Sequence, residues 1–247
     1  MSTAELLVTR PSDGVAVLTL NRPDRRNALS ASLVERLQEA VEAAEADGVR
    51  LLVLRGEGAS FCSGFDLGDL ERETDGDLLL RFVRIEMLLQ RLYSASLVTL
   101  ALAHGRIAGA GADLFAACDR RVIVEEATFS FPGAGFGIVL GTGRLIARVG
   151  RDRARQIVRS GREISAAEAL ETGLAGARIS RQDVEPLIAQ ESGTAARLDR
   201  ATVRAIHVVD GHDGADDMAH LVWSAAQPGL KERILAYRER VRSAKAK

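Results

Sequence analysis

Apolar and polar residues alternate in two short segments at the start of the chain, Leu6–Thr9 and Val15–Leu20. Alternation with a period of two is typical of a strand with one buried face, and Asp13-Gly14 between the segments favours a hairpin turn. Leu51–Leu54 is a continuous apolar run of strand length, which indicates a buried strand. The chain is therefore predicted to open with a β-hairpin and then a third, buried strand.

Apolar residues recur at helical spacing on either side of this third strand. Ser32 and Glu35 have the spacing of a capping box, and the helical pattern that follows them ends at Gly48. A second helix is predicted over Leu78–Tyr93, with inward positions expected at Leu79, Phe82, Ile85, Met87 and Leu89. Both segments therefore predict amphipathic helices with one buried face.

Strands and helices alternate as far as Gly150, after which helices dominate. Three further strands are predicted, over residues 97–103, 122–124 and 128–131. From about Thr194 the strand signals disappear and amphipathic helices continue to Leu230–Val241. Strands that alternate with helices indicate the α/β fold class. We expect two parts, a core over residues 1–193 and a helical region over residues 194–247.

Composition and charge narrow the class of protein. The 247 residues are 47% apolar and 27% charged, with a formal net charge of -1, which is typical of a globular protein and does not suggest a nucleic-acid partner. Cys62 and Cys118 lie far apart, as expected for reduced buried thiols. No metal is expected, because neither the two cysteines nor His207, His212 and His220 have the spacing of metal ligands. Without a membrane-spanning run or a signal-peptide pattern, we expect a cytoplasmic location and no membrane partner.

Two loops, over residues 61–67 and 104–113, share one pattern. Each follows a predicted buried strand, is rich in glycine or other small residues, and leads into a helix. Free N–H groups at the start of a helix carry partial positive charge, and small residues allow a ligand to approach them closely. Two such N–H groups that converge on one point would form an oxyanion hole for a thioester oxygen. Alternatively, both loops are tight turns that only pack a helix on a strand.

Five motifs occur together between Val15 and Gly176: Asn21-Arg22-Pro23 with Arg26-Asn27-Ala28-Leu29, Phe61 to Leu67, His104 to Asp119, Phe129 to Pro132, and Ser165 to Gly176. Together they resemble the crotonase (enoyl-CoA hydratase/isomerase) superfamily. The resemblance implies a spiral of ββα units and a C-terminal helical trimerisation region, where Leu221, Trp223 and Leu230 are either subunit contacts or core residues. It also implies a homotrimer or hexamer, and no cofactor, because coenzyme A is part of the substrate.

The resemblance assigns an acyl-CoA site to these motifs. It implies that the backbone N–H groups of Ser63 and Ala110 form the oxyanion hole. The CoA-binding residues that it implies are Arg26, Ala28, Phe61, Asp66, Leu67, Tyr237 and Arg240. Arginine suits phosphate because its planar donors match phosphate oxygens, although Arg240 also lies in a run of charges typical of a solvated helix face.

The acid and base positions set this chain apart from hydratases of the superfamily, which carry two glutamates. This chain has Asp113 at the position of the first glutamate. At the position of the second glutamate it has Gly133, which has no side chain. The implied function is an enoyl-CoA hydratase/isomerase-like enzyme that binds an acyl-CoA thioester and uses Asp113 as its catalytic residue. The alternatives are another crotonase-type reaction (thioester hydrolysis, decarboxylation or C–C cleavage) and a non-catalytic acyl-CoA binder. Asp113 would otherwise have a structural role, such as pairing with Arg106.

Overall fold

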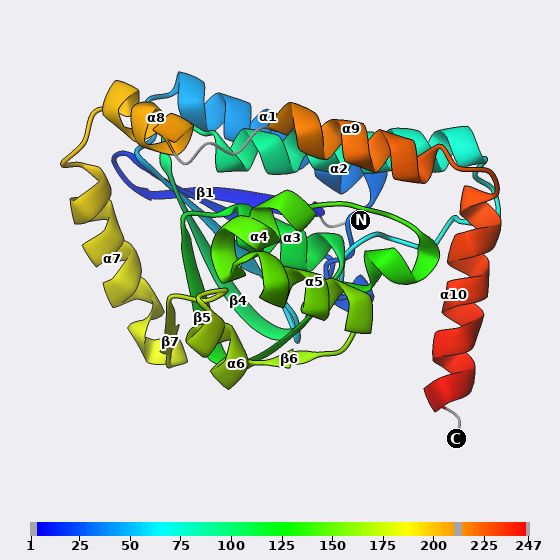
Figure 1. Cartoon of the computed structure of the whole chain (residues 1–247). Helices are drawn as coiled ribbons and strands as arrows, with labels where there is room; N and C mark the ends of the chain where they lie inside the picture. The colour runs from blue at the N-terminus through cyan, green and yellow to red at the C-terminus, as the bar shows by residue number, and fades with distance from the viewer. Residues whose placement is uncertain (1–3, 210–213, 246–247) are drawn as a thin grey trace.

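A computed structural model describes residues 4–209 and 214–245, which form one mixed sheet with helices on both faces (Figure 1). The strand order is β1-β2-β3-β4-β5-β6, and β7 pairs with β5. Strands β2, β3, β4 and β5 are parallel to one another, whereas β1 is antiparallel to β2 and β6 is antiparallel to β5. The strands are β1 Leu6–Ser12, β2 Val15–Leu20, β3 Leu51–Gly56, β4 Val98–Ala108, β5 Arg120–Ser130, β6 Ile164–Ser165 and β7 Ala177–Ile179.

Helices cover the two faces of the sheet unequally. The larger core lies between one face and the helices α1, α2 and α3, whereas α7 packs on the other face through Ile188 and Ala195. The helices are α1 Ala31–Ala46, α2 Asp75–Tyr93, α3 Ala110–Ala117, α4 Thr142–Val149, α5 Arg151–Ser160, α6 Ala166–Thr172, α7 Val184–Ala195, α8 Arg200–Val209, α9 Gly214–Ala225 and α10 Leu230–Lys245, with 3-10 turns η1 Pro23–Arg25, η2 Pro132–Phe136 and η3 Arg181–Asp183. The predicted α/β class and helical C-terminal part are confirmed.

The C-terminal helices pack back onto the core. α9 lies along α2, and α10 contacts both α2 and η2 (Figure 1). Leu221 and Leu230 are fully buried in an apolar cluster with α2, which makes them core residues of this chain, whereas Trp223 is 70% exposed. The predicted boundary at residue 194 falls within the last turn of α7, and the division into two parts stays a prediction. Residues 1–3 and His212 lie outside the described residues.

Several local predictions need correction. The N-cap of α1 is Ser30, whose hydroxyl accepts a hydrogen bond from the Leu33 N–H at 3.1 Å, so the predicted capping box at Ser32 is wrong. β5 is continuous where two strands were predicted, because Glu125 adopts a positive φ of 64° without ending the strand. Met87, predicted to face inward, is 51% exposed on α2. The hairpin at the N-terminus is confirmed.

Candidate functional site

The two predicted glycine loops meet at the carboxyl ends of β3 and β4. A Cβ atom on Gly64 would lie 2.4 Å from the Ala108 carbonyl oxygen, and one on Gly111 would lie 2.4 Å from the Cys62 carbonyl oxygen. Both distances are far below van der Waals contact, so only glycine fits at these two positions. The loops therefore interlock backbone against backbone, and the Gly64 Cβ position is 3.2 Å from the Ala110 nitrogen.

Two backbone N–H groups are left free where the loops meet. Ala110 is the first residue of α3, and its N–H precedes the helical hydrogen bonds. A short parallel bridge joins Leu29 to Phe65, in which the Leu29 N–H donates to Gly64 (2.7 Å) and the Asp66 N–H donates to Leu29 (3.2 Å). Successive N–H groups of an extended segment point to opposite sides. The Phe65 N–H is therefore directed away from Leu29, and it has no acceptor among the described residues.

The first predicted oxyanion donor is wrong. The Ser63 N–H donates to the Arg26 carbonyl oxygen at 3.0 Å, and is therefore not available to a ligand. Its hydroxyl donates to the Arg25 carbonyl oxygen at 3.3 Å. Phe65, two residues later, has a free N–H instead, and the oxyanion role of Ala110 stays a prediction. No local signal in the sequence separates Phe65 from Ser63, because the two residues lie on either side of Gly64.

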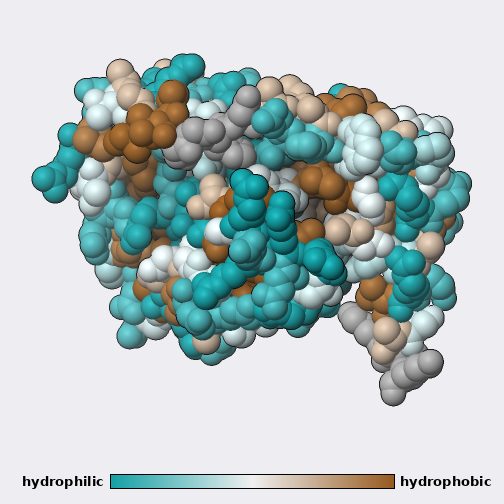
Figure 2. Space-filling model, viewed as in Figure 1, coloured by the Kyte–Doolittle hydropathy of each residue, from teal (hydrophilic) through white to brown (hydrophobic). Residues whose placement is uncertain are grey.

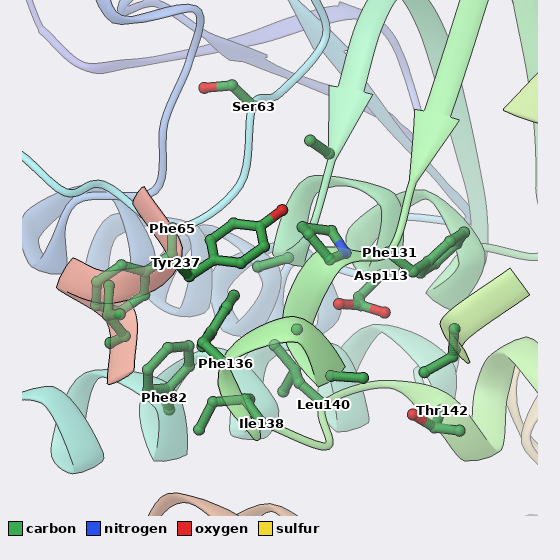
Figure 3. A pocket seen from close by; sticks show the side chains of 18 of the residues that line it. Ser63, Phe65, Phe82, Asp113, Phe131, Phe136, Ile138, Leu140, Thr142 and Tyr237 are labelled. Carbon is green, nitrogen blue, oxygen red and sulfur yellow. The ribbon is translucent and has the colours of Figure 1, made fainter. Parts of the chain in front are cut away.

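A cavity of about 140 Å³ lies beside these two N–H groups. Asp113 enters it from α3, Phe82 from α2 and Tyr237 from α10 (Figure 3). Its walls are mainly apolar, and include Phe65, Phe82, Phe131, Phe136, Ile138, Leu140, Leu145 and Ile234. Such a cavity suits an apolar group that is anchored at one end by a few polar atoms.

The only carboxyl group that lines this cavity within the described residues is Asp113. Asp113 follows Ala110 by three residues on α3, so both lie on one face of the helix. Its side chain is buried, and Oδ1 has no hydrogen-bond partner in the described part of the chain. Burial raises the pKa of Asp113 well above its ordinary value, and the carboxylate of Glu86 raises it further, although Arg144 acts in the opposite direction.

Gly141 lies directly against the Asp113 carboxyl group. A Cβ atom on Gly141, whose φ is 66°, would lie 2.2 Å from Asp113 Oδ1. At Gly133, the second acid position implied by the resemblance, a Cβ atom would lie 3.0 Å from the Ile138 carbonyl oxygen. Arg106 pairs with Glu163 at 2.7 Å, so the suggested pairing of Asp113 with Arg106 is wrong.

A buried ionic cluster behind Asp113 could not be predicted from spacing. Arg144 on α4 is 1% exposed and forms ion pairs with Glu86 of α2 and, at 3.0 Å, with Asp217 of α9. The other oxygen of Glu86 accepts a hydrogen bond from Gln90 at 3.0 Å. Because an unpaired buried charge is costly, this cluster fixes α4, and with it the Gly141 turn over Asp113, against α2 and α9. Its one sequence signal is Glu86, a charged residue at an inward position of a predicted helix.

Three of the residues proposed to bind CoA line the cavity or the depression beside it. Leu67 and Tyr237 line the cavity, while Arg26 lines a second depression that also contains Ser63, Arg106 and Tyr237. Phe61 is fully buried in the core, which leaves its side chain no surface for CoA, so this prediction is wrong.

Ala28, Asp66 and Arg240 stay predictions. Ala28 is 7% exposed, and the Asp66 carboxylate forms an ion pair with Arg22 at 2.7 Å. Arg240 is exposed and donates to the Gly135 carbonyl oxygen at 2.8 Å, which ties α10 to η2 at the wall of the cavity. All three positions therefore already have structural contacts within this chain.

No group of three or more metal-ligating side chains occurs in residues 4–209 and 214–245. None of the helices described there is long and apolar enough to cross a membrane. The described site offers backbone N–H groups, one carboxyl group and an apolar cavity.

Comparison with known proteins identifies the family. The family model for enoyl-CoA hydratase/isomerase matches residues 10–207. A solved structure assigned as an enoyl-CoA hydratase/isomerase from Bordetella parapertussis has 47% identity and a TM-score of 0.92, and the match covers 95% of this chain and 98% of that one. The Mycobacterium leprae protein named as enoyl-CoA hydratase echA6 is 34% identical over 192 residues, or 74% of this chain and 75% of its own. This chain, with its crotonase-like fold, therefore belongs to the enoyl-CoA hydratase/isomerase family.

Proposed function

We propose that this protein binds an acyl-CoA thioester with an apolar acyl group and stabilises the thioester enolate. The observation that carries the proposal is the pair of free N–H groups of Phe65 and Ala110, which lie next to each other at the edge of an apolar cavity. Fixed N–H dipoles that face the developing oxyanion stabilise it without reorganisation, because they are already oriented before the reaction. The acyl chain would lie in the cavity, and the CoA phosphates would lie near Arg26 at the mouth.

Asp113 is the proposed acid/base. It is the one carboxyl group among the described cavity-lining residues, and it lies one helical turn from Ala110. A buried carboxyl group with a raised pKa is a stronger base once ionised than an exposed one, and a single group can remove a proton and return it to a different carbon. Isomerase-type chemistry fits this arrangement better than hydration, because hydration in this superfamily uses two carboxylates and Gly133 supplies none. No cofactor beyond the CoA moiety of the substrate is proposed.

A non-catalytic acyl-CoA binder is the second candidate. Two observations favour it: Asp113 is only 4% exposed, and the glycine at position 133 leaves no second acid or base at the site. In that case the Phe65 and Ala110 N–H groups would anchor the thioester oxygen, and no proton would move. Other crotonase-type reactions, in which the oxyanion hole acts with other acid/base groups, have no specific observation in their favour.

The deciding experiment combines binding with proton exchange. Calorimetric titration with acetyl-CoA and longer saturated acyl-CoAs measures affinity, while incubation in deuterated water measures exchange at the α-carbon by mass spectrometry. Exchange catalysed by the wild type and reduced on the order of 10²-fold or more in Asp113→Asn supports the isomerase-type role. Binding without exchange in either protein supports the binder. Rapid hydration of crotonyl-CoA would contradict the single-carboxylate mechanism, and failure to bind any acyl-CoA would contradict the whole proposal.

The oligomeric state is part of the proposal, with a homotrimer or hexamer in the cytoplasm expected. Apolar side chains of α8 and α9 are exposed on the single chain, including Ile206, Val208, Val209 and Trp223 (Figure 2 shows those of α8 at the upper left). Trp223 is the one tryptophan of the sequence, so its fluorescence reports this surface directly. We expect its quenching by acrylamide to decrease as protein concentration rises and subunits associate. Concentration-independent quenching together with a monomeric mass would contradict the oligomer.

A further inference from the structure

Three arginines without an ion-pair partner among the described residues form a stripe on α5. Arg151, Arg155 and Arg159 are spaced four residues apart, which places them on one side of the helix, and all three are exposed. None of them forms an ion pair or side-chain hydrogen bond with any of the described residues. Their neighbours differ, because Arg153 pairs with Glu171 at 3.9 Å and Arg162 pairs with Glu168. We call Arg151, Arg155 and Arg159 the arginine stripe.

The arginine stripe works against the stability of its own helix. Like charges four residues apart repel one another, and α5 contains a single acidic residue, Asp152. The chain as a whole has a net charge of -1, so this clustering is local and not a reflection of a basic protein. An anionic partner would turn this repulsion into attraction, and would also be steered toward the surface from a distance.

The stripe lies beside the candidate acyl-CoA site. Val158 of α5 lines the apolar cavity, and Gly161, directly after the helix, lines the depression at its mouth together with Arg26. Arg155 and Arg159 themselves line a shallow surface depression together with Asp152, Gln156 and Ser160. The face of the molecule over α4 and α5 is predominantly hydrophilic (Figure 2). A partner on the stripe is therefore close enough to deliver a ligand to the cavity.

The length of the stripe agrees with an extended anionic partner. Eight residues of helix separate Arg151 from Arg159, which is about 12 Å at 1.5 Å per residue. This spacing suits a row of carboxylates along an acidic helix better than one phosphate group. Phosphates of CoA already have Arg26 at the mouth of the site under the proposed function.

The geometry points to a docking surface for a small acidic carrier protein that presents the acyl group as a thioester on a phosphopantetheine arm. The acidic helix of the carrier would lie along the arginine stripe, and the arm would enter the mouth beside Gly161. This inference rests on the proposed function, since the same cavity and the same two N–H groups would receive the thioester. It extends the substrate class from CoA esters to carrier-bound acyl groups.

The test compares two forms of the same acyl group. A bacterial acyl carrier protein that bears a non-hydrolysable octanoyl-phosphopantetheine is labelled fluorescently, and its binding is measured by anisotropy, beside calorimetric titration with octanoyl-CoA. The variant Arg151→Glu/Arg155→Glu/Arg159→Glu reverses the stripe. The matched control, Arg36→Glu/Arg181→Glu/Arg197→Glu, makes the same change of charge at exposed arginines that line neither the cavity nor its mouth. Circular dichroism and thermal melting verify that both variants fold.

We expect the stripe variant to bind the acyl-carrier about tenfold or more weakly, with a reduced dependence on salt, and to bind octanoyl-CoA within about twofold of the wild type. The control is expected to bind both ligands like the wild type. The inference is overturned if the stripe variant binds the acyl-carrier as tightly as the wild type does. It is also overturned if the wild type binds octanoyl-CoA but does not bind the carrier. An equal loss for both ligands would also overturn it, and would assign the stripe to CoA phosphates. If the wild type binds neither ligand, the proposed function itself has failed.

Discussion

Gly111→Ala is the substitution that most directly perturbs the proposed oxyanion hole. Gly111 lies in the first turn of α3, next to Ala110, and has no positive φ, so alanine introduces no backbone strain there. Its added Cβ would lie 2.4 Å from the Cys62 carbonyl oxygen and 2.9 Å from the Cys62 carbonyl carbon. Ordinary van der Waals contact begins at 3.4 Å, so the two loops must separate by about 1 Å.

A separation of this size is enough to disable one donor. Donors in an oxyanion hole lie about 2.7–3.1 Å from the oxyanion, and a further 1 Å takes one of them beyond hydrogen-bonding distance. Loss of one such donor costs about 10²–10³ in rate, or about 2.7–4 kcal/mol of transition-state stabilisation. We therefore expect Gly111→Ala to lower α-proton exchange by about that factor and to weaken acyl-CoA binding by less.

The matched control is Gly193→Ala on α7. A Cβ atom at Gly193 meets nothing within 4 Å, and alanine is a better helix former than glycine. We expect the control to exchange α-protons and bind acyl-CoA like the wild type, with equal or greater thermal stability. If Gly111→Ala folds and retains the full exchange rate, then the contact between the two loops does not position the Ala110 N–H, and the reasoning is refuted. If the wild type catalyses no α-proton exchange, the two glycine variants are compared with it by their affinity for acyl-CoA.

Three further predictions concern the buried ionisable groups. Arg144→Met leaves Glu86 buried without its cation, so we expect the free energy of unfolding, measured by urea denaturation, to fall by roughly 3–5 kcal/mol. Adding Glu86→Leu to this variant should restore most of the lost stability, and a double variant without recovery would contradict the ion-pair explanation. Since burial raises the pKa of Asp113, the folded chain retains a proton that the unfolded chain releases above about 3.8. The wild type should therefore lose up to about 1.4 kcal/mol of stability per pH unit between that value and the folded pKa, and Asp113→Asn should lack this slope; identical slopes would show that Asp113 is not the group responsible. Burial also raises the pKa of Cys62 and Cys118 to about 12. Both thiols should therefore resist iodoacetamide in the native protein near pH 8 and react after unfolding. Stoichiometric labelling of the native protein would show that one of the thiols is accessible.

Local patterns in the sequence were sufficient for most of the secondary-structure elements. The hairpin, the buried strands and the main helices follow from apolar periodicity, which acts over a few residues and is little affected by the rest of the chain. The resemblance to the crotonase superfamily, and not apolar periodicity, assigned Ala110 and Asp113 to the site. The free N–H of Ala110 is itself a property of the local backbone, because a glycine turn leads directly into its helix.

The remainder of the site depends on packing between distant segments. Ser63 and Phe65 are equivalent by local pattern, and only the pairing of their loop with Leu29 and Arg26 decides which N–H is free. Arg144 pairs with residues 58 and 73 positions away, so no spacing rule brings them together. The N-cap at Ser30 was missed because two serines lie two residues apart and both satisfy the capping preference.

The most direct test of the central claim is the infrared absorption of the bound thioester carbonyl. An acyl-CoA labelled with ¹³C at the thioester carbon is added to the protein, and the difference spectrum isolates that one C=O stretch. Because the Phe65 and Ala110 N–H groups polarise the carbonyl toward the enolate, the account predicts a shift to lower wavenumber on binding, which decreases in Gly111→Ala. A bound acyl-CoA whose carbonyl absorbs as it does in water, unchanged by Gly111→Ala, would contradict the claim that these N–H groups form an oxyanion hole.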